Sequence, residues 1–216
     1  MYNCAAVISR GKIHALVPKT YIPNYNEFYE KRWFSSGAEV TEDLAELLGE
    51  PVPVLPRAVF RVGGTLLGVE ICEDVWSPVP PSIEAAREGA IILVNCSASD
   101  ETIGKDSYRE ELIKGQSARL IAGYVYANAG DGESTTDVVF GGHNIIAENG
   151  TILKESSRYV NEIIYSELDL QRITGERRKN TTFQPLDEET LVRVPFTVEE
   201  TKTFLTRTFP KKPFVP

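Results

Sequence analysis

Hydrophobic positions along the chain recur in short runs that are typical of β-strands. Apolar and β-branched residues predict strands at 4–9, 12–18, 57–62, 65–71 and 90–95, and further strand-like stretches at 124–128, 137–150 and 160–168. Arg10 and Gly11 lie between the first two runs, where a tight turn is expected. The first half of the chain is therefore predicted to be rich in strands.

Helical patterns lie between some of these strands. We expect a helix over residues 40–48 with Thr41 as its cap, a second after Ser82 that stops at Gly89, and a longer one over 108–120. The apolar residues that share a face of the first helix are Val40, Leu44, Leu47 and Leu48. Alternating strands and helices predict an α/β layered fold, and tight glycine turns predict antiparallel pairs. Both a doubly wound sheet and a sandwich of sheets remain open.

The pattern changes at about Gln171. The stretch RRKNTTFQPLDEE is charged and rich in turn residues, and only a weak helical piece is visible, near Thr197 to Thr206. The closing PKKPFVP cannot continue a helix, because proline lacks the backbone donor. We predict a main domain over residues 1–170 and a connector tail over 171–216.

Charge and cysteine content narrow the classes of partner. The formal net charge is -8 and the pI is about 5.0, which argues against nucleic acid and anionic membranes as partners. Three cysteines without a CxxC pair argue against a disulfide framework or a zinc site. No apolar run reaches the roughly 18 residues of a membrane span, and the start does not resemble a signal peptide. We expect a soluble, cytoplasmic protein.

The stretch GVEICEDVW places Cys72 at the end of a predicted strand, before the helix-incompatible SPVPP. Two interpretations are open: a buried, inert thiol, or a nucleophile exposed at a sharp turn. The only histidines, His14 and His143, are better interpreted as packed or surface residues than as bases for this thiol. Lys19 ends another predicted strand and precedes an aromatic-rich segment, so it is either a surface lysine or part of a site.

Two long motifs connect these residues to a known family. K-x-Y-x-P-N-Y-x-E-F-Y-E-x-R-x-F, followed by G-x-x-I-C-E-D-x-W, resembles the nitrilase (carbon-nitrogen hydrolase) superfamily, and within it the glutaminase domains of glutamine-dependent NAD synthetases. The stretches NCSASDETIGK, YVYANAGDGESTTDVVFGGHNIIAENG and FLTRTFPKKPFVP are similar as well. The resemblance implies a nitrilase-like α-β-β-α sandwich with mixed sheets. It also implies hydrolysis of the glutamine amide through a cysteine thioester, with the ammonia used for ATP-dependent amidation of deamido-NAD to NAD.

The same resemblance implies roles for individual residues. Cys72 matches the nucleophile, and Lys19 matches the cation that favours the thiolate and stabilises the oxyanion, together with the backbone N–H of Glu73. Glu27 matches a further glutamate that orients the site, and Lys105 a basic residue for the substrate carboxylate. The positions that match residues holding the glutamine are Tyr25, Phe28, Glu73 and Ser99. No metal ligand is implied.

The chain also departs from the family pattern. The glutamate that acts as general base belongs before the lysine motif, and only 18 residues precede Lys19. We therefore expect a sandwich that lacks its first strand-helix units, with little activity alone. An open sheet edge would then favour a homo-oligomer.

The synthetase half of such enzymes has no counterpart in the sequence. It contains neither S-G-G-x-D-S nor G-x-x-x-x-G-K-[ST], and GGTLLG and AGDGES are interpreted as turns. We expect no cofactor here; ATP, magnesium and deamido-NAD would bind an absent synthetase domain of the same full-length chain, toward which the tail leads. The alternatives are a free-standing amidase or carbamoylase of the superfamily, and a non-catalytic interaction domain with an inert cysteine.

Overall fold

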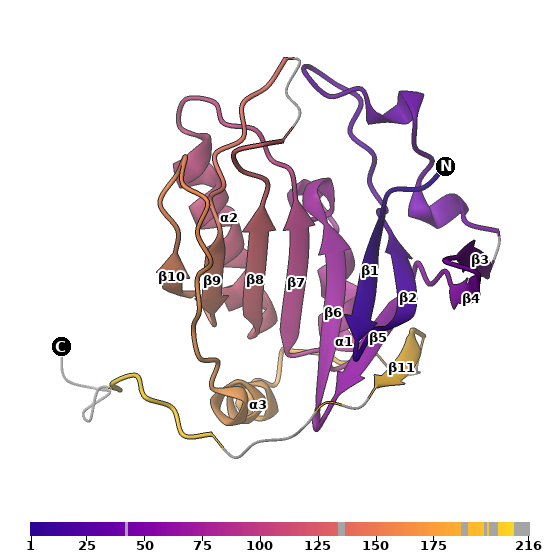
Figure 1. Cartoon of the computed structure of the whole chain (residues 1–216). Coiled ribbons are helices and arrows are strands. Elements are labelled where there is room, and N and C mark those ends of the chain that lie inside the picture. The colour runs from indigo at the N-terminus through magenta and orange to yellow at the C-terminus, as the bar shows by residue number, and fades with distance from the viewer. Residues whose placement is uncertain (42, 134–136, 187–189, 197, 199–202, 210–216) are drawn as a thin grey trace.

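A seven-stranded mixed sheet forms the centre of the molecule (Figure 1). The computed structural model describes residues 1–41, 43–133, 137–186, 190–196, 198 and 203–209. The strand order is β10-β9-β8-β7-β6-β5-β11. The strands of this sheet are β5 (Ala58–Val62), β6 (Thr65–Ile71), β7 (Ile92–Ser97), β8 (Gly123–Asn128), β9 (Ile145–Glu148), β10 (Thr151–Glu155) and β11 (Val192–Phe196).

Two helices cover one face of the sheet. α1 (Pro81–Arg87) connects β6 to β7 and α2 (Lys105–Leu120) connects β7 to β8, so the three strands run parallel as successive βαβ units. Gly68 of β6 allows α1 to approach closely, because a Cβ there would lie 2.7 Å from the Cβ of Ala85. The larger buried core lies on this side and includes Leu93, Ile113 and Tyr124.

A hairpin packs against the opposite face. β1 (Cys4–Ser9) and β2 (Lys12–Pro18) pair antiparallel and contact β6, and they stand in front of the sheet in Figure 1. The turn residues Arg10 and Gly11 both have positive φ, 51° and 73°, as the favoured two-residue hairpin turns require. A second core on this side is formed by Ala15, Val17, Ala58 and Phe60. The mixed, layered α/β fold predicted from the sequence is confirmed, and β1, β2, β5, β6, β7 and β8 lie close to the predicted positions.

The helix predicted over residues 40–48 is wrong. The region forms a small hairpin of β3 (Leu44–Leu47) and β4 (Glu50–Pro53) instead. Its turn residues, Leu48 and Gly49, have φ values of 55° and 78°, which a right-handed helix excludes. Leu44 and Leu48 are also 58% and 89% exposed, so the expected apolar face buries little.

The strand predicted over residues 160–168 is wrong as well, since the segment joins no sheet. Its polar contacts involve side chains instead: Asn144 donates to the carbonyl of Glu162 at 3.4 Å, and the Ser157 amide donates to the Glu162 carboxylate at 2.6 Å. The segment has a strand-like composition, but no strand of the described structure pairs with its backbone, so it does not form a strand.

The region after Gln171 is more ordered than the sequence indicates. α3 (Leu170–Lys179) buries Ile173, and its Arg177 donates to the carbonyls of Ala90, Leu120 and others. β11 pairs in parallel with β5 and completes the large sheet. Of the weak helix expected near Thr197 to Thr206, residues 197 and 199–202 lie outside the described residues, and residues 198 and 203–206 are not helical. The division at residue 170 stays a prediction, but α3 and β11 pack on the main body.

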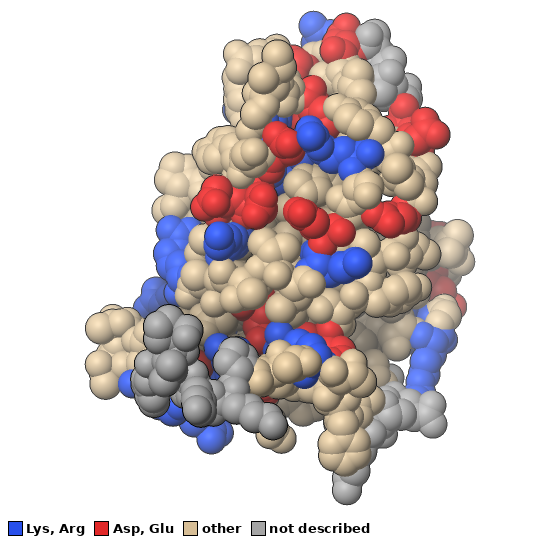
Figure 2. Space-filling view, turned by 90° about the vertical axis from the view of Figure 1, so that its left-hand side faces the viewer, with Lys and Arg blue, Asp and Glu red and all other residues tan. Residues whose placement is uncertain are grey.

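Charged side chains of both signs are interspersed on the face that carries the β10 edge (Figure 2). An ion pair between Arg158 and Asp106, at 3.0 Å, is one of the surface pairs in the structure. In the described part of the chain, no helix is long and apolar enough to cross a membrane.

Candidate active site

Cys72 lies where β6 ends, at a sharp backbone turn. Its φ is 45°, a left-handed conformation that is uncommon for a residue with a side chain, and a short 3-10 helix, Cys72–Trp76, begins there. The residue is 8% exposed. A strand that reverses into a short helix at a cysteine brings the sulfur to the carboxyl edge of the parallel strands β6 and β7, where ligands of α/β folds usually bind.

Asn95 on the neighbouring strand β7 fixes this turn. The Cys72 N–H donates to Asn95 Oδ1 at 2.9 Å, and Asn95 Nδ2 donates to the Cys72 carbonyl at 3.4 Å and to the Tyr124 hydroxyl at 3.3 Å. The Tyr124 hydroxyl in turn donates to Glu70. All these side chains are buried, so they form a continuous polar network from the Cys72 turn into the core.

Burial raises the pKa values of two groups in this network, Glu70 and Tyr124. Glu70 is 2% exposed, and desolvation raises its pKa to about 7 against the hydrogen bonds from Tyr124 and Ser82, which lower it. The pKa of the Tyr124 hydroxyl is raised well above its ordinary value, first by burial and then by the nearby Glu70 carboxylate. Tyr124 therefore stays a protonated donor at neutral pH.

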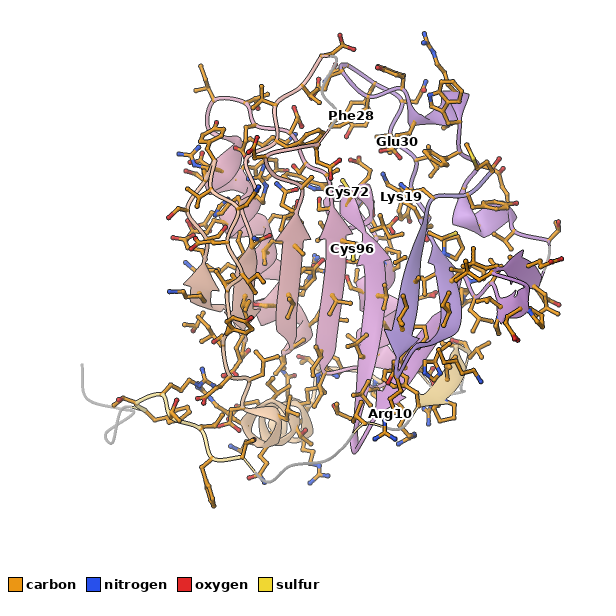
Figure 3. The ribbon with its side chains drawn as sticks, in the orientation of Figure 1. Arg10, Lys19, Phe28, Glu30, Cys72 and Cys96 are labelled. Carbon is orange, nitrogen blue, oxygen red and sulfur yellow. The ribbon has the colours of Figure 1, made fainter. Side chains whose placement is uncertain are left out.

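Lys19 points toward the same strand ends from the hairpin side. Its ammonium is 1% exposed and donates to both carboxylate oxygens of Glu30 at 2.8 Å. Glu30 begins a short 3-10 helix, Glu30–Arg32. Figure 3 shows Lys19, Glu30 and Cys72 together above the ends of β6 and β7, with Phe28 above Cys72 and Arg10 at the far end of the hairpin. The buried cation is thus paired, as a lysine in such a place must be.

Two backbone contacts hold Lys19 in place. Its N–H donates to the Asn3 carbonyl at 2.8 Å, and its carbonyl accepts from Gly37 at 2.7 Å. A Cβ on Gly37 would lie 2.8 Å from the Pro18 carbonyl and 2.9 Å from that of Lys19, so only glycine fits this approach. The position of the lysine therefore depends on a residue eighteen positions further along the chain.

Asp74 joins the lysine segment to the cysteine turn. Its carboxylate accepts from the backbone N–H groups of Thr20 at 3.1 Å, Tyr21 at 2.8 Å and Ile71 at 2.9 Å. Burial raises its pKa to about 6, against the opposing effect of these hydrogen bonds and of Lys19. One buried carboxylate therefore fixes the distance between the two chain segments that carry Cys72 and Lys19.

A cavity of about 330 Å³ opens beside Cys72. The predicted site residues that line it are Tyr25, Glu27, Phe28, Cys72, Glu73, Ser99 and Lys105, and the other lining residues include Trp76, Thr102, Ile103 and Tyr108. These residues come from three separate regions of the sequence. The structure thus brings every predicted pocket residue except Lys19 to one cavity.

Charged and aromatic side chains line different parts of this cavity. The Tyr25 hydroxyl donates to Glu73 Oε1 at 2.7 Å, while Lys105 pairs with Asp100 at the other side. The Lys105 ammonium also lies 5.4 Å from the centre of the Phe28 ring and 5.8 Å from that of Trp76. A carboxylate and an ammonium therefore face a shared space from different elements, an arrangement suited to an amino-acid zwitterion.

Lys19 lines a second cavity, also of about 330 Å³, together with Glu30, Cys4, Cys96 and Cys72 itself. Cys72 is the residue that both cavities share. The thiol therefore forms part of the wall between the pocket and the lysine.

Sequence reasoning missed three residues of this site. Glu30 is the carboxylate bound to Lys19, while Glu27 lines the cavity beside Cys72, and Asn95 and Asp74 hold the turn. Glu30 and Asp74 both stand inside the two motifs, so their motif positions were the available signal. Asn95 is the first residue of the similar stretch NCSASDETIGK, but it ends a predicted strand and was given no role. Among the described residues, no group of three or more His, Cys, Asp or Glu side chains is arranged to hold a metal ion.

Comparison with known proteins decides the family. The carbon-nitrogen hydrolase profile matches residues 1–178. The chain belongs to the carbon-nitrogen hydrolase family. Among curated family members, it is 42% identical over 188 residues to a glutamine-dependent NAD(+) synthetase of Mycobacterium tuberculosis, which covers 85% of this chain and 28% of that protein. A Thermotoga maritima protein of the same name is 31% identical over 171 residues, covering 78% of this chain and 26% of its own length.

Solved carbon-nitrogen hydrolase structures agree with this assignment. A glutamine-dependent NAD(+) synthetase from Cytophaga hutchinsonii superposes with a TM-score of 0.60 at 26% identity, covering 73% of this chain and 25% of that one. The Acinetobacter baumannii enzyme gives 0.62 at 25% identity, over 80% and 29%. The nitrilase-like fold predicted from the motifs is confirmed. The chain spans little more than a quarter of the curated relatives it matches.

Proposed function

We propose that this carbon-nitrogen hydrolase chain is a glutamine amidohydrolase that supplies ammonia to a synthetase domain, for ATP-dependent conversion of deamido-NAD to NAD. The observation that carries the proposal is the cavity beside Cys72, which is lined by Tyr25, Phe28, Glu73, Ser99 and Lys105. Its support is the 42% identity to relatives named glutamine-dependent NAD(+) synthetases. ATP, magnesium and deamido-NAD would be ligands of the synthetase part.

Glutamine fits the charges of this cavity. Its α-ammonium would lie near the Glu73 carboxylate that Tyr25 orients, and its α-carboxylate near the Lys105 ammonium. The side-chain amide would then extend toward Cys72. A simple amide carries no charged groups to complement Glu73 and Lys105, so it gains nothing from the two groups that would hold the zwitterion. This distinguishes the proposal from a general amidase or carbamoylase.

The proposed reaction has two halves. The Cys72 thiolate attacks the amide carbon, and the developing oxyanion is stabilised by the Lys19 ammonium and the Glu73 N–H. The C–N bond then breaks as the nitrogen takes up the proton that the thiol gave to the base. Ammonia leaves, and a glutamyl thioester remains on Cys72. Water then attacks the thioester carbon and releases glutamate and the thiol, so that glutamine and water become glutamate and ammonia.

A general base has to take the thiol proton and later activate water. The Glu30 carboxylate is engaged by Lys19 and the Glu73 carboxylate by Tyr25. A positioned base contributes about 10²- to 10⁴-fold to rate. We therefore expect the chain alone to turn glutamine over slowly, although its thiol can still be acylated or alkylated.

The test is covalent labelling of Cys72 by an electrophilic glutamine analogue, read by intact mass. We expect one adduct on Cys72, suppressed by excess glutamine, with Cys72→Ala as the control. Equal suppression by acetamide would support the general amidase instead. If a small thiol reagent labels Cys72 and the analogue does not, the glutamine assignment is refuted. If Cys72 resists both reagents, the inert-cysteine alternative gains support.

A further inference from the structure

Arg109 is a fully buried arginine that the proposed reaction does not use. It lies in α2, and its side chain is 0% exposed. Its guanidinium contacts the loop before α2, and among the described residues it is not part of the lining of the cavity beside the thiol. A completely desolvated cation is costly unless it is paired and hydrogen-bonded. The hydrogen bonds and the ion pair that offset this desolvation cost therefore identify the segments that Arg109 holds in place.

Three consecutive residues of the loop receive those contacts. Arg109 Nη2 donates to Ser99 Oγ at 3.3 Å and to the Asp100 carbonyl at 3.0 Å, and Nη1 donates to Glu101 Oε1 at 2.7 Å. The Glu101 side chain is 3% exposed, so this ion pair is buried on both sides. The planar guanidinium therefore fixes side chains and backbone of the loop at once.

The fourth contact ties the loop to another part of the chain. Arg109 Nη1 lies 3.1 Å from Nδ1 of His143. Since a guanidinium can only donate, Nδ1 must accept, and the ring proton then lies on Nε2, which faces Glu155 Oε2 at 3.4 Å. Arg109 thus connects the loop before α2 to the segment that enters β9.

The loop in question forms one wall of the cavity. Ser99, Thr102, Ile103, Gly104 and Lys105 all line it, and Asp100 pairs with Lys105. On the opposite side of Ser99, Asn128 accepts from its N–H at 2.8 Å and donates to its carbonyl at 3.0 Å. Asn128 therefore fixes the start of the wall, and Arg109 fixes the part that leads to Lys105.

We propose that Arg109 is a positioning residue that holds residues 99–105 in the geometry required to bind the α-carboxylate of glutamine. It acts through Ser99, Asp100 and Lys105 and touches no reacting atom. The identity of the substrate, glutamine, rests on the proposed function. The positioning of residues 99–105 by Arg109 does not depend on it. Lysine cannot replace Arg109, because a single ammonium cannot reach the same set of partners in their fixed directions.

The test compares Arg109→Lys with two controls in the same helix. Arg119→Lys makes the same chemical change at an exposed residue. Ile113→Ala removes a fully buried side chain that belongs to the apolar core, and so lowers stability by a different route. All variants carry the full chain. Hydrogen exchange of residues 99–105 and 72–76 is measured first, and then the glutamine concentration that half-protects Cys72 from iodoacetamide.

For Arg109→Lys we expect amide exchange in residues 99–105 to rise about tenfold or more, while residues 72–76 stay unchanged. The half-protecting glutamine concentration should rise about 10- to 100-fold, since small misplacements of binding groups cost this much. The rate of Cys72 alkylation without glutamine should stay within about twofold of wild type, since the thiol is held by other residues.

Each other outcome decides one of the two proposals. Unchanged exchange in residues 99–105 overturns the positioning role. Equal effects in Ile113→Ala also overturn it, because they reduce Arg109 to a contributor to stability. If exchange rises in Arg109→Lys but glutamine fails to protect even wild-type Cys72, the wall is positioned by Arg109 as inferred, and the glutaminase function is what fails.

Discussion

Glu70→Gln should change how stability depends on pH. Glu70 lies buried in the network below the Cys72 turn, where it accepts from Tyr124 and from the Ser82 N–H at 2.9 Å. Glutamine has the same shape: its oxygen can accept from Ser82 while its amide donates to the Tyr124 oxygen. The substitution therefore removes the titration and keeps the packing.

The magnitude follows from the pKa. Burial raises the pKa of Glu70 from its ordinary value of 4.5 to about 7. A raised carboxyl pKa means that the folded state favours the protonated form, so the contribution to stability is complete below pH 4.5 and is lost as pH rises through 7. At 1.36 kcal/mol per pH unit the full loss is about 3 kcal/mol, of which about 2 kcal/mol falls between pH 5.5 and 8. Full burial leaves little solvent screening to reduce it.

The assay is urea unfolding of wild type and Glu70→Gln at intervals from pH 5.5 to 8, above the pI of about 5.0. We expect the variant to gain about 2 kcal/mol relative to wild type across this range. Asp74, whose pKa is also raised, titrates in both proteins; its charge contributes to the raised pKa of Glu70, so the difference includes the coupling between the two carboxyl groups. Glu111→Gln, at a side chain that is 73% exposed, controls for the loss of one charge. Parallel profiles for wild type and Glu70→Gln would refute the reasoning.

Three further substitutions test the geometry of the site. Asn95→Ala should lower the free energy of unfolding by about 2 kcal/mol and slow alkylation of Cys72, because the turn loses its side-chain partner; an unchanged rate would show that the turn holds itself. Glu30→Gln should slow the same alkylation about tenfold at pH 7, because a buried lysine without its charge partner favours the neutral amine, which cannot stabilise a thiolate. Glu27→Gln should stay within about twofold, and the reverse order would support Glu27 as the orienting glutamate. Gly37→Ala should cost about 1–3 kcal/mol in urea unfolding, since its Cβ would meet backbone oxygens, and a neutral effect would mean that the segment shifts freely.

The elements that sequence pattern predicted well are those whose partners are near in the chain. The hairpin β1–β2 has its turn residues and its alternation within fifteen residues, and β6-α1-β7 shows strand, cap and stop signals in order. The elements that were predicted wrongly lack such nearby partners. Residues 40–48 carry a helical spacing of leucines, but two turn residues with positive φ override it, and no core lies near enough to bury those leucines.

The residues of the site likewise fall into those that the sequence indicated and those that it did not. The motifs indicated Cys72, Lys19 and the residues of the pocket wall, because chemistry-bearing residue types stand there in a fixed order. The sequence named Glu27 by resemblance and gave no partner for Lys19, since spacing along an irregular segment does not tell which carboxylate turns toward a lysine. Asn95 and Arg109 act through hydrogen bonds that exist only after strands and loops distant in sequence have met. Such contacts leave no local pattern to find.

The parallel pairing of β11 with β5 has a consequence for how the molecule is made. The register joins Val192 to Ala58, so one edge of the sheet is completed by a strand that is synthesised after all the other strands of that sheet and long after its partner β5. Until then β5 presents unpaired backbone groups, which can pair with another chain. Contacts of such long sequence separation also form slowly. The nascent chain therefore passes through a period in which the sheet that carries Cys72 is open along the β5 edge, and aggregation during synthesis is most probable in that interval.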